Sequence, residues 1–217
     1  MILIKPSFEI LQITENPLQL IELSGRTCYK SEDRITPESN IKFCQSILSR
    51  KHESVIEHAV ATVKLIVDRG VSHELVRHRL ASYSQESTRY CNYKTGITFI
   101  IPPWVDILPG EYNSFNTSED YDNNSWMWGV SMIRSEQSYL DLLSHGWTPQ
   151  QSRSVLPNSL KTEIVTTANL REWRHIFNLR CDKAAHPQMR EIMIPLREEF
   201  QRRISVIFNE EKNSMGK

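Results

Sequence analysis

The sequence predicts an α+β fold in which a mostly antiparallel central sheet is flanked by helices. Alternating or β-branched segments at 2–13, 59–67, 96–102 and 160–168 predict the strands. Between them lie amphipathic stretches of helical spacing, and no internal repeat, linker or low-complexity block divides the chain. Because 217 residues are enough to bury one sizeable core, residues 1–217 are expected to form a single domain.

The helices are predicted from apolar spacing combined with start and stop signals. Thr36 is a good N-cap residue, and Ser72 is predicted to cap a short helix that ends in a Ser/Tyr-rich turn. Residues 104–124, rich in Asn, Asp, Ser, Gly and Pro, are expected to be irregular. The predicted helices cover 17–30, a segment after Thr36-Pro37, 73–80, 126–143, a segment after Thr148-Pro149, 170–180, and a last helix running past Phe208 with a kink at Pro195.

Composition excludes several classes of protein. The 26 basic and 26 acidic residues cancel, which favours a small anionic ligand over a nucleic acid. No apolar run approaches the ~20 residues of a membrane helix, and the N-terminus lacks the pattern of a signal peptide. The four cysteines are scattered without a Cys-x-x-Cys pair. We therefore expect a soluble cytoplasmic protein with no membrane or nucleic-acid partner.

One stretch, residues 77–89, concentrates polar chemistry. It holds three arginines, one histidine and several hydroxyl side chains, with apolar segments on both sides. Guanidinium groups present a fixed fork of N–H donors that matches phosphate or carboxylate oxygens. Because unpaired charge between buried elements is costly, we interpret the stretch as an anion pocket and not as a solvated basic turn.

Two other kinds of site are disfavoured by spacing. A zinc-protease helix needs two histidines four residues apart, whereas His52 and His58 are six apart and His73 and His78 are five apart. The sequence therefore predicts no metal site. A Ser–His hydrolase needs a strained elbow such as Gly-x-Ser-x-Gly, and the sequence contains none.

The predicted helix 170–180 has two different faces. Arg171 and His175 share one face at helical spacing, while Arg180 falls on an apolar face with three large side chains, Trp173, Ile176 and Phe177. From this segment alone Arg180 either extends toward the helix C-terminus or reaches into a pocket. Both interpretations remain open at this point.

The pattern Arg77-His78-Arg79, seven residues, Ser87-x-Arg89 resembles the signature of the flavin-dependent thymidylate synthase family. The resemblance covers about residues 50–182. Its other parts are His52-Glu53-Ser54-x-x-Glu57-His58, Arg153-x-x-Leu156-Pro157 and Asn169-x-Arg171-x3-His175-x4-Arg180.

This resemblance implies an enzyme that makes dTMP from dUMP. Methylenetetrahydrofolate would give the carbon, NADPH would reduce a bound FAD, and the flavin would pass the hydride on. The family implies a homotetramer with sites between subunits. The rival hypotheses are a non-catalytic nucleotide- or phosphate-binding module, which would not be yellow, and a flavin reductase that acts on a different substrate.

The resemblance also implies roles for single residues. Flavin contacts are implied for His52, Ser54, Arg77, His78, Arg79, Gln85, Asn169, Arg171 and His175. Contacts with dUMP are implied for Glu74, Arg77, Gln85, Glu86, Ser87, Arg89, Arg153 and Arg180. Arg180 resembles the residue that faces the uracil ring, so it is the expected catalytic residue, stabilising an anionic uracil and lowering the pKa of its N3–H. Ser87 has no evident paired base, so we assign it a hydrogen-bonding role.

Overall fold

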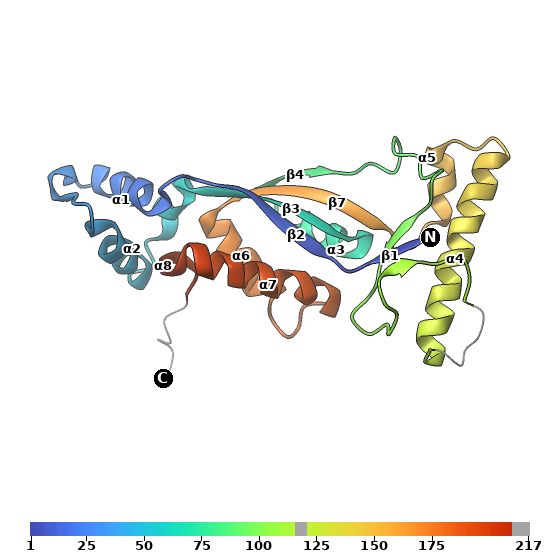
Figure 1. The fold of residues 1–217 in the computed structure, drawn as a ribbon. Coiled ribbons are helices and arrows are strands. Elements are labelled where there is room, and N and C mark those ends of the chain that lie inside the picture. Colours follow the sequence, from blue (N-terminus) through green and yellow to red (C-terminus); the bar gives the residue numbers. More distant parts are fainter. Residues whose placement is uncertain (116–120, 210–217) are drawn as a thin grey trace. The chain divides into compact units, whose positions relative to one another are not determined.

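A computed structural model of the chain describes residues 1–115 and 121–209 (Figure 1). It contains both helices and sheets, which confirms the α+β class. The chain forms two compact units, each assembled from separate segments. The first unit comprises Met1–Phe8, Leu65–Arg77 and Tyr83–Val165, and the second comprises Glu9–Lys64, His78–Ser82 and the chain from Thr166 onward. The single-domain organisation stays a prediction.

The larger sheet has four strands in the order β2 (Ser7–Ile13), β3 (Val60–Asp68), β7 (Lys161–Asn169) and β4 (Ala81–Gln85). Along β3 and β7 buried and half-buried side chains alternate, as expected where one face of a sheet covers a core. These two strands confirm the predictions for 59–67 and 160–168.

The smaller sheet belongs to the first unit and has the order β5 (Thr98–Ile100), β1 (Ile2–Ile4), β6 (Gly110–Glu111). Strand β1 pairs with β5 in parallel and with β6 antiparallel. The strand predicted over 2–13 is therefore two strands, separated at Lys5-Pro6. Proline lacks the N–H that a strand interior needs, which accounts for the break.

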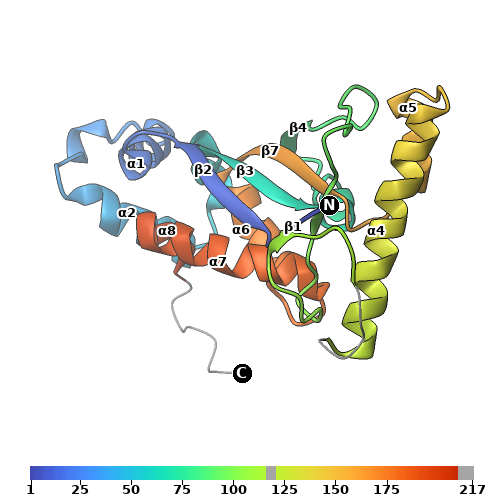
Figure 2. The same cartoon turned by 45° about the vertical axis from the view of Figure 1, so that its right-hand side comes forward.

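The core of the first unit forms where α4 (Asn123–Ser144) packs with the small sheet, and α5 (Pro149–Ser152) and the 3-10 turn η3 (Arg153–Val155) contact this helix. The first unit also contains α3 (Arg69–Leu75). Figure 2 shows α4 lengthwise. Glu136 of this helix accepts a bond from the Ile97 N–H at 2.8 Å and pairs with the N-terminal amine at 2.9 Å. The buried cluster comprises Met1, Leu3, Ile97, Phe99, Ile101, Val105, Ile107, Phe115, Met132, Tyr139 and Leu160.

The second unit is mostly helical and has an aromatic core. Four rings, those of Trp173, Phe177, Phe200 and Phe208, pack with centroid separations between 5.0 and 5.8 Å, in tilted or edge-to-face pairs. Helices α1 and α2 lie side by side in both views (Figures 1 and 2). Its helices are α1 (Pro17–Thr27), η1 (Glu32–Arg34), α2 (Ser39–Ser49), η2 (Glu53–His58), α6 (Leu170–Arg180), α7 (Pro187–Arg203) and α8 (Ser205–Phe208).

One predicted helix is misplaced, and one predicted cap is wrong. Helix α3 spans Arg69–Leu75 and not 73–80, because the Asp68 carboxylate accepts the Val71 N–H at 2.8 Å and caps the helix before Ser72 can. Helix α2 begins at Ser39, after Thr36-Pro37 as predicted, but its N-cap is Glu38 and not Thr36. The Ser39 hydroxyl accepts the Thr36 N–H at 2.9 Å, so these residues form a turn before the helix.

The Ser/Tyr-rich segment predicted as a turn is also different, because Ala81–Gln85 forms strand β4 next to β7. Exposed Ser82 and Ser84 alternate with half-buried Tyr83 and Gln85. This period of two is typical of an edge strand with a solvated face, and the hydroxyl-rich composition obscured it.

The structure also tests the predictions for 104–124 and for the last helix. The stretch 104–124 is irregular apart from β6 and the start of α4, and its residues 116–120 lie outside the described ranges. The last predicted helix is two helices, because Ile204 adopts non-helical angles (φ −136°, ψ 57°) between α7 and α8, while Pro195 lies inside α7. Residues 210–217 also lie outside the described ranges.

Among the described residues, no helix combines the length and apolar character required to cross a membrane.

The aromatic core generates a stability prediction. Phe200 is fully buried and contacts the other three rings of the cluster, so Phe200→Ala should lower the free energy of unfolding by about 3–5 kcal/mol. The matched variant Phe200→Leu keeps most of the buried volume and should cost about 1 kcal/mol. Urea denaturation measures both. Equal losses for the two variants would show that ring packing is not what stabilises this unit.

Candidate functional site

Helix α6 carries the centre of the site. The Asn169 side chain accepts the Glu172 N–H at 2.8 Å and so caps the N-terminus of the helix. On one face Trp173 is buried and donates its indole N–H to the Ala61 carbonyl at 3.1 Å, which ties the helix to β3. On the other face Arg171 and His175 are exposed. The prediction of two distinct faces is thus confirmed.

Arg180, in the last turn of α6, reaches into a polar cluster. Its Nε donates to His78 Nε2 at 2.9 Å, although the two residues are 102 positions apart in the chain. His78 is only 5% exposed. Of the two interpretations left open by the sequence, the structure supports a side chain that reaches inward.

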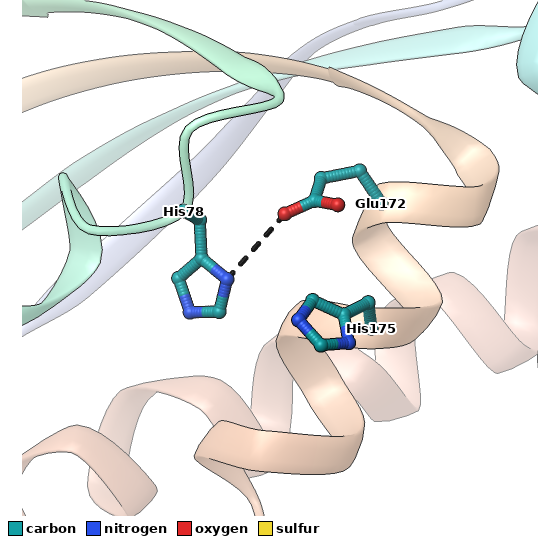
Figure 3. Close-up of side chains that lie close together, drawn as sticks. All are labelled: His78, Glu172 and His175. Atoms are coloured by element: carbon teal, nitrogen blue, oxygen red, sulfur yellow. Dashed lines mark ion pairs between the residues drawn. The ribbon is translucent and has the colours of Figure 1, made fainter.

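The other nitrogen of the His78 ring faces a carboxylate. Figure 3 shows Glu172 beside His78, with His78 Nδ1 lying 3.4 Å from Glu172 Oε1. Glu172 is 7% exposed, so its charge is largely removed from water. His175, one turn further along α6, packs its ring edge against His78 with centroids 5.7 Å apart.

The cluster keeps His78 neutral. Burial lowers the pKa of His78 to about 4, and the neighbouring Arg180 and His175 contribute to this lowering by disfavouring a second positive charge. A neutral imidazole has one donor and one acceptor nitrogen. Because Nε2 accepts from Arg180, the proton resides on Nδ1, which faces Glu172.

His78, Glu172 and His175 also offer three potential metal ligands within 4.8 Å of one another. A cation bound at His78 Nδ1 would require the lone pair on that nitrogen and move the proton to Nε2. Two N–H groups, from Arg180 and from His78, would then face each other. Metal binding and the observed bond from Arg180 are therefore mutually exclusive.

Four other residues for which flavin contacts are implied are exposed on the second unit. His52 and Ser54 flank the start of η2 and are exposed, as is Arg79. Arg171 is half exposed and pairs with Glu57 and, more distantly, with Glu53. Exposed ion pairs are weak, typically below about 1 kcal/mol, so an anionic ligand can compete for this guanidinium.

In the first unit, Gln85 bonds within the protein. Its amide nitrogen donates to Ser72 Oγ at 2.8 Å and to Thr162 Oγ1 at 3.2 Å. These bonds fasten β4 to β7 and to α3. In this structure the Gln85 amide nitrogen therefore bonds to two hydroxyl groups of the protein, and direct contact with a ligand stays a prediction.

Glu86 is held in a similar way. Its carboxylate accepts the Tyr93 hydroxyl at 3.0 Å and the Lys161 ammonium at 3.1 Å, and its N–H donates to the Glu163 carbonyl at 2.8 Å. Burial and the adjacent Glu86 raise the pKa of Tyr93 well above its ordinary value, so Tyr93 remains a hydrogen-bond donor.

The remaining implied dUMP residues also belong to the first unit. Arg153, in η3, is exposed and donates to Thr88 Oγ1 at 3.0 Å. Arg89 is exposed and donates to Gln150 Oε1 at 3.2 Å, while its N–H donates to Ser87 Oγ at 3.3 Å. These bonds hold Arg89 and Arg153 on the exposed surface of the unit.

The implied roles divide almost completely between the two units. The dUMP residues, including Glu74 of α3 and the exposed Arg77 that follows it, lie in the first unit, apart from Arg180. The flavin residues lie in the second unit, apart from Arg77 and Gln85. The ligand contacts themselves stay predictions.

Sequence reasoning missed Glu172. Its position in the first turn of α6, three residues before His175 and on the same side of the helix, was the available signal. What the sequence could not supply was its neighbour, because His78 lies 94 positions earlier. Lys161, which binds Glu86, was missed for the same reason.

Comparison with known proteins places this geometry in context. Residues 9–204 match the model of the Thy1 family, described as thymidylate synthase complementing protein. A flavin-dependent thymidylate synthase from Geobacter sulfurreducens is 31% identical over 194 residues, covering 86% of this chain and 78% of the relative. One from Pyrococcus furiosus is 31% identical over 204 residues, covering 89% and 78%. The crystal structure of a UMP/dUMP methylase, PolB from Streptomyces cacaoi, bound with 5-Br dUMP, matches the fold with a TM-score of 0.78 and 22% identity, covering 96% of this chain and 95% of that one.

The lowered pKa of His78 generates a pH prediction. Its folded value of about 4 lies below the ordinary value of 6.5, so the unfolded chain takes up a proton first as the pH falls. The unfolding free energy that depends on His78 being neutral is therefore fully present above pH 6.5, and it is lost as the pH falls toward 4. Between pH 7 and pH 5 the wild type should therefore lose roughly 2 kcal/mol more unfolding free energy than His78→Gln does.

Denaturant unfolding at the two pH values measures this difference. Because the surface carboxylates are the same in both proteins, their contribution cancels in the comparison. Identical pH dependence in the wild type and in His78→Gln would mean that His78 titrates normally in the folded protein.

Proposed function

The chain belongs to the thymidylate synthase complementing protein family, and from this premise we propose that it is a flavin-dependent thymidylate synthase. In this reaction dUMP becomes dTMP, with methylenetetrahydrofolate as the carbon donor and NADPH as the reductant of FAD. The observation that carries the proposal is the family match over residues 9–204, which contains every residue assigned a role by the signature. Relatives that are about 30% identical over most of the chain bear the same name.

The first unit is the proposed binding site for dUMP. The phosphate of dUMP is a dianion, and the exposed guanidinium groups of Arg89 and Arg153 are suited to bind it in a bidentate manner. Ser87 lies beside Arg89 and adds a hydroxyl group. The structurally similar methylase is bound with 5-Br dUMP, which supports this choice of ligand.

The second unit is the proposed holder of the flavin. Its exposed donors, Arg79, Arg171, His52 and His175, match the chemistry of a pyrophosphate and an isoalloxazine ring. FAD supplies the hydride transfer that protein side chains do not provide. The protein would bind and orient the cofactor. Asn169 holds the α6 N-terminus and so fixes the positions of Arg171 and His175.

Arg180 is the proposed catalytic residue. Facing the uracil ring, its guanidinium would stabilise negative charge on the ring and lower the pKa of the N3–H. The orientation of the guanidinium group is fixed before the substrate binds, because the Arg180 Nε already donates to His78. Electrostatic stabilisation of this kind acts without a covalent bond to the protein.

The cysteines are poorly suited to nucleophilic attack on uracil. Burial, together with the charge of Glu22, raises the pKa of Cys44 to about 12, and burial also raises the pKa of Cys181. Cys28 is exposed and Cys91 is half buried, and neither lies within the signature. These observations support electrostatic activation of the substrate.

The folate donor, the NADPH reductant, the homotetramer and the cytoplasmic location remain parts of the proposal. Several large apolar side chains are exposed on the isolated chain, among them Leu80 (75%) and Leu179 (50%). Burial of these side chains by another subunit would be favourable, which is compatible with the proposed oligomer.

A purification and turnover experiment tests the proposed function. The wild type should purify yellow, change its flavin absorption spectrum when dUMP is added, and form dTMP when folate and NADPH are supplied. Arg180→Ala should retain flavin but lose at least about 100-fold in turnover, because one charge-stabilising donor is removed. A matched control is Arg134→Ala, an exposed arginine on α4, which should behave as the wild type.

Three outcomes would count against the proposal. A colourless protein that takes up no FAD would favour a nucleotide-binding module. A yellow protein whose spectrum ignores dUMP would favour a flavin reductase with another substrate. Near-normal dTMP formation by Arg180→Ala would remove Arg180 from the mechanism.

A further inference from the structure

Three side chains, those of Arg180, His78 and Glu172, form a continuous chain of contacts. Arg180 Nε lies 2.9 Å from His78 Nε2, and His78 Nδ1 lies 3.4 Å from Glu172 Oε1. All three belong to the second unit, and Glu172 and Arg180 sit at opposite ends of α6. His78 therefore connects the first turn of the helix to its last turn.

The direction of the hydrogen bond defines the state of the imidazole. A guanidinium has no acceptor, so Arg180 donates and His78 Nε2 must keep its lone pair. In a neutral ring this leaves the proton on Nδ1, which faces the Glu172 carboxylate. A ring protonated on Nε2 would present an N–H to Arg180, and a ring rotated by half a turn would present a C–H, so either change would break the bond.

Glu172 is an almost fully buried carboxylate, although the family resemblance implies no ligand contact for it. A carboxylate that is 7% exposed is costly unless a donor faces it. Its position in the first turn of α6 is electrostatically favourable, since the helix N-terminus carries partial positive charge. This position also directs its side chain toward His78 (Figure 3).

We propose that Glu172 is a positioning residue that acts on Arg180 through His78. By accepting from Nδ1–H, Glu172 holds the imidazole in the tautomer whose Nε2 receives the Arg180 Nε–H, and so fixes the plane of the guanidinium. The arrangement parallels a catalytic triad, in which a buried carboxylate sets the tautomer of a histidine. The consequence for turnover rests on the proposed function, whereas the tautomer does not.

Three ionisable groups that face His78 belong to one helix, α6. They are Glu172, His175 and Arg180, and two of the three disfavour a protonated ring. Glu172 is the acidic member of this set. Truncating it removes the carboxylate that faces Nδ1 and so favours exchange of the tautomer or rotation of the ring.

Nuclear magnetic resonance of histidine-labelled protein (15N) tests the tautomer directly, with or without flavin. The wild type should show His78 protonated on Nδ1, and His78→Gln assigns the signal. Glu172→Ala should shift the population toward the Nε2–H form, while the nearly isosteric Glu172→Gln, which retains an acceptor oxygen, should shift it less. A matched control is Glu198→Gln, an exposed carboxylate on α7, which should leave the spectrum unchanged.

Kinetics of the holoenzyme test the link to Arg180. Glu172→Ala should lower kcat for dTMP formation by roughly 10- to 100-fold while flavin content stays at the wild-type level, and Glu172→Gln should recover part of the loss. In a double-mutant cycle, Glu172→Ala should have little further effect when His78 is already Gln, because the two residues act in series. A general loss of structure would instead make the two effects add.

Each result has a defined meaning. A wild-type His78 protonated on Nε2, a tautomer that ignores Glu172→Ala, or additive effects in the cycle would each overturn the proposal. Stoichiometric binding of Zn²⁺ that requires Glu172 and abolishes the Nδ1–H signal would overturn it in favour of a metal site. If the wild type made no dTMP, the proposed function would fail, while the tautomer measurement would still decide the role of Glu172.

Discussion

The hydrogen bond from Arg180 to His78 requires a neutral imidazole, and the second unit is built to keep it neutral. Burial opposes a charge on His78, and the guanidinium itself opposes a second cation beside it. The bond also disfavours metal binding, because a metal ion at His78 Nδ1 would move the imidazole proton from Nδ1 to Nε2. The same few contacts thus orient an arginine and disfavour a metal ion at His78 Nδ1.

Local patterns were enough to predict the elements that carry this site. Strands β3 and β7 alternate in a simple period of two, and α6 begins at an asparagine cap and ends at Arg180 as its sequence indicates. Such features depend on neighbours within a few positions, which a sequence displays directly. The signature around residues 77–89 contains His78, the buried member of the cluster, while the interpretation of the whole stretch as an anion pocket stays a prediction.

What escaped prediction depends on distant residues or on competition between neighbours. Asp68 and Ser72 are both good N-cap residues, and it is Asp68, at the end of β3, that caps helix α3. Strand β4 is polar on its solvated face, so its composition suggested a turn, while its pairing with β7 decides the outcome. The contact between His78 and Glu172 spans 94 positions, and only the folded chain brings them together.

The way β4 is fastened has a consequence for how this segment can vary in evolution. Gln85 bonds to Thr162, and the adjoining Glu86 bonds to Glu163 and Lys161, so the strand is locked in one register against β7. Because side chains alternate along a strand, inserting or deleting a single residue between 81 and 85 would turn every side chain to the opposite face. We therefore expect homologous sequences to exchange residue types here more readily than they change the number of residues in the segment.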